Sequence, residues 1–90
     1  MSVADAFRWN DWNLEHATKH GVTVFEIESV VRNARRPYPR YIGDRKAQVV
    51  GRGNGGRFIQ VFFVLDPEGT KYVIHAMPVN PRRPKRGRKQ

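Results

Sequence analysis

The spacing of hydrophobic positions divides the chain into a helical first half and a second half rich in strands. Near the N-terminus, Phe7-Arg8-Trp9 alternates apolar and polar side chains, which predicts a short edge strand. Asn10 or Asp11 can then cap a helix over residues 12–20, because these side chains accept hydrogen bonds from free helix N–H groups. Gly21 follows, and glycine is the usual residue where the chain ends a helix in the left-handed backbone conformation.

A second, amphipathic helix is predicted to start near Val24. Thr23 and Glu26 have the spacing of a capping box, in which each side chain bonds the other residue's backbone N–H. Val22 and Ile27 can form the accompanying hydrophobic staple. The apolar stripe that would face the core consists of Ile27, Val30, Val31 and Ala34.

The second half reads as strands separated by turns. Pro37 ends the second helix, because the residue before a proline avoids helical geometry, and residues 37–44 form an irregular or edge segment. Three further strands are predicted over residues 47–52, 57–65 and 71–77, with turns at 53–56 and 66–69. The pattern predicts an α+β fold, with two N-terminal helices packed on an antiparallel β-sheet and a short N-terminal strand.

Charge favours a polyanionic partner such as RNA, DNA or an anionic membrane. The 90 residues include 17 Lys and Arg against 8 Asp and Glu, a formal net charge of +9. Six of the basic residues lie within residues 82–90, which leaves 11 basic against 8 acidic residues, or +3, for residues 1–81. We therefore expect one domain over 1–81 and a basic, flexible tail over 82–90, which is either a solvated end or an RNA-binding arm. The candidate RNA contacts are Arg45, Lys46, Arg82, Arg83, Lys85 and Arg86.

Composition also argues against several classes of site. The chain has no cysteine, so it has neither a disulfide framework nor a thiolate site. The N-terminus lacks a charged-then-apolar signal pattern, and the longest apolar stretch, residues 58–65, is too short to cross a bilayer. We expect a cytoplasmic protein without a membrane partner.

Two histidines, His16 and His20, would lie on one face of the first helix. The zinc-protease motif needs a glutamate directly after the first histidine, whereas Glu15 precedes it here, and no third ligand is near. We therefore expect no metal at this pair. Lys19 and His20 fall in the last helical turn, where positive charge is favoured by roughly 0.3–1 kcal/mol, and phosphate contact is the alternative role.

The predicted hairpin at residues 53–56 places two arginines near its mouth. If Asn54-Gly55 occupy the centre of a primed turn, Arg52 and Arg57 face each other across the strands. Like charges directly opposite are destabilising, and a bound phosphate would offset that cost. The alternative is that both guanidinium groups point into water.

His75 is the candidate acid or base of the last predicted strand. It is expected to share a face with Val73 and Met77, opposite either Gln60 or Val61. Its unperturbed pKa lies near neutral pH, which suits general acid–base catalysis, although a histidine on a sheet is more often structural.

An ordered set of short motifs runs along residues 7–78. Its members are Phe7-Arg8-Trp9-Asn10, Asn13, Lys19-His20-Gly21-Val22, a helix containing glutamate, Gly51-Arg52, Gly56-Arg57 and Ile74-His75-Ala76. The set resembles the BrnT-type toxins of bacterial type II toxin–antitoxin pairs. The resemblance implies a RelE-like fold, RNA cleavage without a metal or other cofactor, and neutralisation by a small DNA-binding antitoxin. A homodimer is a further possible assembly.

The resemblance also implies roles for five polar residues. Arg52 and Arg57 would stabilise charge on the phosphate, and His75 would act as the acid or base. Lys19 and His20 would lie near the phosphate. The chain departs from the family at Met77, where an arginine is usual, so a non-catalytic RNA- or protein-binding module on the same fold is the alternative function.

Overall fold

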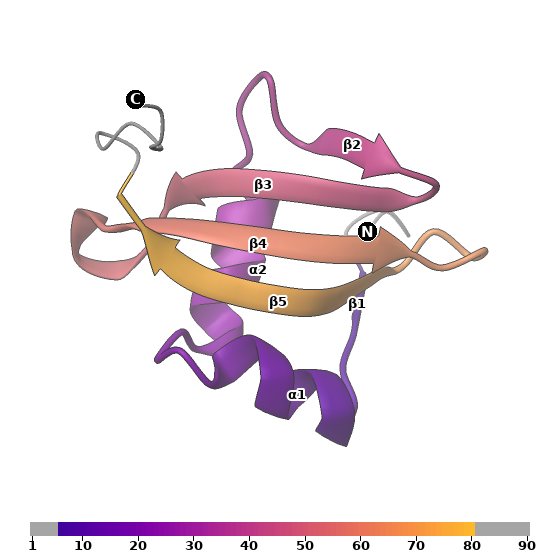
Figure 1. Cartoon of the computed structure of the whole chain (residues 1–90), viewed down its shortest axis with the longest axis horizontal. Helices are drawn as coiled ribbons and strands as arrows, with labels where there is room; N and C mark the ends of the chain where they lie inside the picture. The colour runs from indigo at the N-terminus through magenta and orange to yellow at the C-terminus, as the bar shows by residue number, and fades with distance from the viewer. Residues whose placement is uncertain (1–5, 81–90) are drawn as a thin grey trace, which may run out of the picture.

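The computed structural model describes residues 6–80, which form a mixed α+β domain (Figure 1). The predicted fold class is confirmed, including the two N-terminal helices and the short N-terminal strand. In chain order the elements are β1 (Phe7–Arg8), α1 (Asp11–Thr18), α2 (Val24–Arg32), β2 (Arg40–Gly43), β3 (Lys46–Arg52), the 3-10 turn η2 (Asn54–Gly56), β4 (Phe58–Leu65) and β5 (Lys71–Val79).

The five strands form one sheet in the order β1-β5-β4-β3-β2. Strands β2 to β5 make an antiparallel meander, as the succession of strands and turns predicts. β1 is parallel to β5 and pairs through Phe7 with Lys71 and through Arg8 with Tyr72. The sheet is therefore mixed, because the chain leaves β1 through both helices before it enters the meander.

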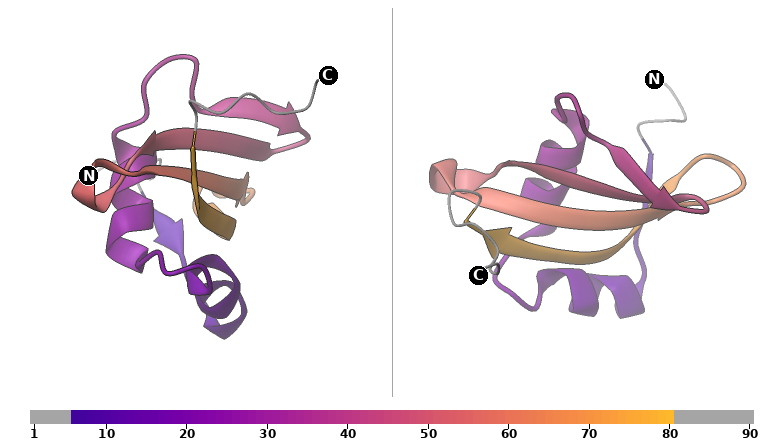
Figure 2. Two further views of the ribbon diagram at one scale, coloured as in Figure 1. Left: turned by 60° about the vertical axis from the view of Figure 1, so that its left-hand side comes forward. Right: turned by 45° about the horizontal axis from the view of Figure 1, so that its top comes forward.

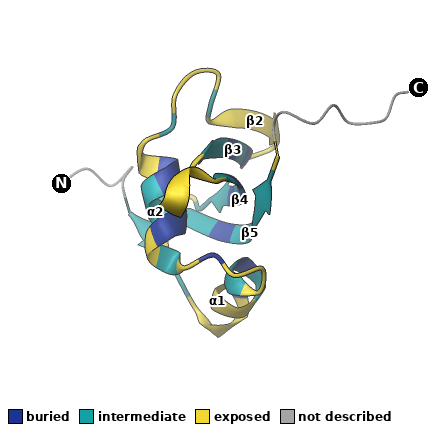
Figure 3. Cartoon of the chain, turned by 90° about the vertical axis from the view of Figure 1, so that its left-hand side faces the viewer, coloured by how far each residue is buried: buried dark blue, intermediate teal, exposed yellow. Residues whose placement is uncertain are grey.

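The helices cover one face and one edge of the sheet. α2 crosses behind β3 and β4, whereas α1 lies along β5 (Figures 1 and 2). No helix of the described residues covers the opposite face, which we call the open face (Figure 3). The core lies between α2 and the sheet, and its fully buried members include Ile27, Val49, Ile59, Val61, Phe63 and Val73.

α1 begins at a side-chain cap and is fixed to β1 by a buried amide. Asn10 is the N-cap and forms a capping box with Asn13, whose Oδ1 accepts from the Asn10 backbone N–H at 2.7 Å. Asn13 is fully buried, and its Nδ2 donates to the Arg8 carbonyl at 3.0 Å. The helix ends at Thr18, two residues earlier than expected, and Gly21 adopts the predicted left-handed conformation with φ of +82°.

α2 confirms only half of the predicted capping box. The Thr23 hydroxyl accepts from the Glu26 backbone N–H at 3.1 Å. The Glu26 carboxylate does not return a bond to Thr23; it is buried and turned toward the loop between β3 and β4. The reciprocal half of the prediction was wrong because a distant arginine, Arg57, competes for this carboxylate. Val22 and Ile27 are both fully buried in the core, as a staple requires.

Candidate active site

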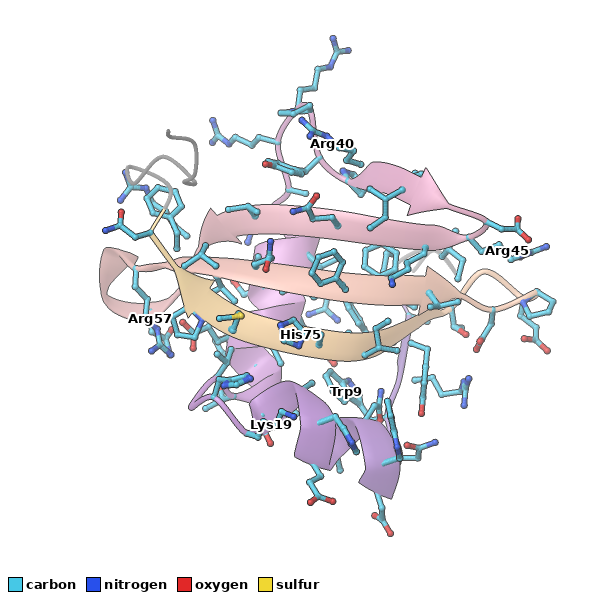
Figure 4. The ribbon with its side chains drawn as sticks, viewed as in Figure 1. Trp9, Lys19, Arg40, Arg45, Arg57 and His75 are labelled. Carbon is cyan, nitrogen blue, oxygen red and sulfur yellow. The ribbon has the colours of Figure 1, made fainter. Side chains whose placement is uncertain are left out.

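Two imidazoles from distant parts of the chain meet beside β5. His20 lies just after α1, and its ring centroid is 5.7 Å from that of His75 in an edge-on arrangement. Lys19, which caps the C-terminus of α1, lies close enough to His75 to affect its titration. Figure 4 shows Lys19 below β5 and His75 on the strand itself. We call Lys19, His20 and His75 the histidine cluster.

A bulge in β5 determines which way His75 points. Val73 is paired with Phe63, but His75 is paired with Phe62, so Ile74 is the extra residue of the bulge. Val73 is buried in the core, whereas the His75 ring lies 5.8 Å from that of Phe62, on the open face. The expected face shared with Val73 was therefore wrong, and so were both expected register partners, Gln60 and Val61.

The surroundings of His75 favour its neutral form. Burial lowers the pKa of the imidazole, and the positive charges of His20 and Lys19 lower it further. Neither the His20 imidazole nor the His75 imidazole donates or accepts a hydrogen bond with another residue in the described range 6–80. The His75 imidazole is therefore not engaged by a hydrogen bond within this range, and its lowered pKa favours the form that can accept a proton.

Arg57 borders this cluster, but its charge is already matched. Its Nη2 lies 2.9 Å from Glu26 Oε1 and its Nε 3.2 Å from Oε2, a two-pronged ion pair. Nη2 also donates to the Gly21 carbonyl at 3.0 Å, directly after His20. Arg57 therefore holds the turn that carries His20, and this positioning role comes in addition to any contact with phosphate.

Glu26 is a site residue that sequence reasoning missed. Glu26 is 1% exposed, and its carboxylate accepts from the Asn54 backbone N–H at 2.7 Å, besides its ion pair with Arg57. These bonds, led by the one from Arg57, hold the pKa of Glu26 below its usual value despite burial. Two sequence features could have indicated this role, namely an acidic residue in the first turn, which helix capping already explained, and the helix containing glutamate in the motif set.

Arg52 does not face Arg57, so the expected arginine pair at the hairpin mouth was wrong. The connection is a loop over residues 53–57 containing the turn η2, and Arg52 is paired with Phe58. The Arg52 guanidinium lies 4.8 Å from the centre of the Phe58 ring, and its Nη1 is 3.4 Å from the Gly56 carbonyl oxygen. Arg52 and the histidine cluster are thus separated rather than one site.

The remaining predicted RNA contacts lie elsewhere. Arg45 is at the far end of the sheet from Arg57 (Figure 4) and donates to the Asp66 carbonyl at 3.4 Å. The Lys46 ammonium lies 5.8 Å from the centre of the Phe62 ring, the same ring that neighbours His75. The predicted contacts in the tail, Arg82, Arg83, Lys85 and Arg86, fall outside the described residues.

His16 is engaged separately from His20. Its ring stacks on Trp12 with centroids 3.9 Å apart, and its Nδ1 lies 2.7 Å from the Trp12 carbonyl oxygen. Among residues 6–80, no three His, Cys, Asp or Glu side chains are grouped so that they could hold a metal ion. Nor does this part of the chain contain a helix that is long and apolar enough to cross a membrane.

Comparisons with known proteins do not assign this chain to a family. Neither family models, nor curated proteins, nor solved structures give a match. The resemblance to BrnT-type toxins therefore depends on the sequence motifs alone.

Proposed function

We propose that this protein is a toxin-like, metal-independent endoribonuclease of a cytoplasmic toxin–antitoxin pair. The observation that carries the proposal is the histidine cluster, in which His75, His20 and Lys19 meet beside β5. The small DNA-binding antitoxin belongs to the proposal through the sequence resemblance.

Two imidazoles and an ammonium group match the needs of RNA cleavage without a metal. A base removes the proton from a ribose 2′-hydroxyl, and the oxygen attacks the adjacent phosphorus. An acid then protonates the departing 5′-oxygen, which leaves a 2′,3′-cyclic phosphate and a free 5′-hydroxyl. In our proposal His75, whose pKa is lowered by burial, is the base, and His20 is the acid. Lys19 stabilises the negative charge of the phosphorane.

The open face supplies a path for RNA to this cluster. On β4, Phe58, Gln60, Phe62 and Val64 are partly exposed, whereas the residues between them are fully buried. Partly exposed aromatic rings beside basic side chains suit single-stranded RNA, because bases stack on rings and phosphates pair with cations.

Cleavage of a single-stranded RNA by the purified protein in the presence of a chelator tests the proposal. His75→Ala and His20→Ala should each lower the cleavage rate roughly 10²–10⁴-fold, the usual contribution of a general acid or base. His16→Ala is the matched control, because it removes another imidazole, one that lies on α1 and stacks on Trp12 outside the histidine cluster. An RNA with a 2′-deoxyribose at the cleaved position should resist cleavage, since it lacks the 2′-hydroxyl that acts as the nucleophile.

Two outcomes would contradict parts of the proposal. If His75→Ala and His20→Ala cleave like the wild type, the histidine cluster is not the active site. If the wild type binds RNA but never cleaves it, the alternative of a non-catalytic binding module is favoured. Met77 is the first residue to change in that case, because it lies on β5 with His75, where it pairs with Gln60 of β4, and because the family usually has an arginine there. Met77→Arg should then produce cleavage if only the missing arginine prevents it.

A further inference from the structure

A pocket of about 560 Å³ lies at the edge of β3, in a place that no sequence motif indicated. β2 pairs with β3 only as far as Gln48, so no strand of residues 6–80 lies on that side of the part of β3 that follows. The segment over residues 33–38 runs beside this uncovered edge and forms one wall. Residues 50–52 and Phe58 form the other, and the volume falls within the usual range for small-ligand sites.

Among the described residues, the pocket is lined by three arginines and by no acidic residue. Arg35, Arg36 and Arg52 line it, and none of them is within ion-pair distance of a carboxylate in the described residues. Other arginines of the fold do have carboxylate partners, namely Arg8, Arg32 and Arg57. Arginines that line one pocket without counter-charges favour a bound anion, and the planar donor pairs of guanidinium groups fit phosphate.

Two aromatic rings complete the lining. Phe58 is partly exposed, and the Arg52 guanidinium lies 4.8 Å from the centre of its ring. Tyr38 is partly buried, packs against the core and contributes the second ring. An aromatic surface beside a cationic group is what a nucleobase with its own phosphate requires.

We propose that this pocket binds one nucleotide of single-stranded RNA, with the base against Phe58 and Tyr38 and the phosphate on Arg35, Arg36 and Arg52. The inference rests on the proposed function for the identity of the strand, since a free nucleoside monophosphate offers the same chemistry. Phe58 lies four residues along β4 from Phe62, the partner of His75. At the usual rise of a strand, the backbones of Phe58 and Phe62 are about 14 Å apart. The pocket would thus hold a nucleotide away from the cleaved bond and select the substrate.

In the first experiment the full chain is titrated with free nucleoside 5′-monophosphates or with inorganic phosphate, and binding is monitored by the backbone amide chemical shifts. Nucleotides should shift the amides of residues 33–38 and 50–52 more strongly than phosphate does. The double variant Arg35→Gln, Arg36→Gln should lose these shifts. A matched double variant, Arg45→Asn, Lys46→Gln, removes the same charge at the other end of the sheet and should keep them.

The second experiment measures binding of a single-stranded RNA whose 2′-hydroxyls are methylated, so that cleavage does not interfere. Phe58→Leu should weaken binding roughly 5- to 150-fold, the worth of one stacked base, without changing the salt dependence. The double arginine variant should lower the log–log salt slope by up to about 0.7, as expected for the loss of one phosphate contact to a single strand. Thermal melting followed by circular dichroism checks that both variants fold.

The outcomes separate this inference from the proposed function. Nucleotide binding in the pocket without any RNA cleavage would support the inference while the nuclease proposal fails. Nucleotide shifts without an effect of Phe58→Leu on RNA affinity would assign the pocket to free nucleotides. The inference is overturned if nucleotides shift no amide in residues 33–38 or 50–52 and neither variant alters RNA binding.

Discussion

At the scale of single residues, one inserted residue in β5 determines which face of the sheet His75 occupies. Without the bulge at Ile74, His75 would keep the face of Val73, which is buried in the core. A shift of one residue moves every following side chain to the other face of a strand. The bulge thus brings His75 beside His20 and Phe62 instead of burying it.

The titration of His75 tests this placement without any assay of activity. The positive charge of Lys19 disfavours the imidazolium, so Lys19→Gln should raise the pKa of His75, and His20→Gln should do the same. The pKa is measured from the imidazole proton resonances, assigned with His75→Ala. Lys46→Gln removes an equal charge that is not among the groups acting on His75, and it should leave the titration unchanged. A pKa that falls or stays constant in Lys19→Gln would show that the two side chains are not neighbours.

At the scale of elements, Glu26 joins the first turn of α2 to the loop between β3 and β4. Its carboxylate binds Arg57 and the Asn54 backbone N–H, and Arg57 continues to the Gly21 carbonyl after α1. Gly53 makes room for this contact, since a Cβ there would overlap the carboxylate and the Ile59 side chain. The turn carrying His20 is therefore held from the hairpin side by one buried acid.

Glu26→Gln should lower the free energy of unfolding by roughly 1.5–3 kcal/mol at neutral pH, the worth of hydrogen bonds to a charged group. The native fold lowers the pKa of Glu26 from its usual 4.5, so the unfolded chain binds more protons on acidification. The advantage of the wild type is then complete above pH 4.5 and disappears as the pH falls through the lower native value. Urea denaturation of both proteins across this pH range measures the difference in their free energies of unfolding.

The control for this prediction is Glu15→Gln. Glu15 is an exposed residue of α1, and the same chemical change there should alter stability by less than about 0.5 kcal/mol. An equal loss in both variants, or a difference for Glu26→Gln that persists at acid pH, would contradict the role given to the buried carboxylate.

Features fixed by neighbouring residues were predictable from the sequence, whereas features fixed by distant partners were not. The Thr23 cap, the apolar stripe of α2 and the turns of the meander depend on spacing within a few residues. The bulge at Ile74 and the partner of Glu26 depend on strands and loops that meet only in the fold. The apolar run of β4 is typical of a strand covered on both faces, yet the described residues cover only one.

At the scale of the whole molecule, the basic groups of the described residues lie at separate places on and around the open face rather than in one patch. The histidine cluster flanks β5, the arginine pocket lies at the edge of β3, and Arg45 is at the far end of the sheet (Figure 4). An RNA strand that crosses the open face would meet cations on three sides and partly exposed aromatic rings between them.

The tail adds the largest block of charge, and it should strengthen RNA binding without setting sequence preference. Residues 82–90 carry six of the 17 Lys and Arg residues, so their deletion lowers the formal charge from +9 to +3. Each contact with a single-stranded phosphate contributes about 0.7 to the log–log salt slope, so deletion should flatten the slope by up to about 4. Affinity is measured at several salt concentrations, on a pool of RNA sequences. A full-length variant with these six residues changed to glutamine separates charge from length and should match the deletion. An unchanged slope, or a changed ranking of the RNA sequences, would show that the tail does not act through its charge alone.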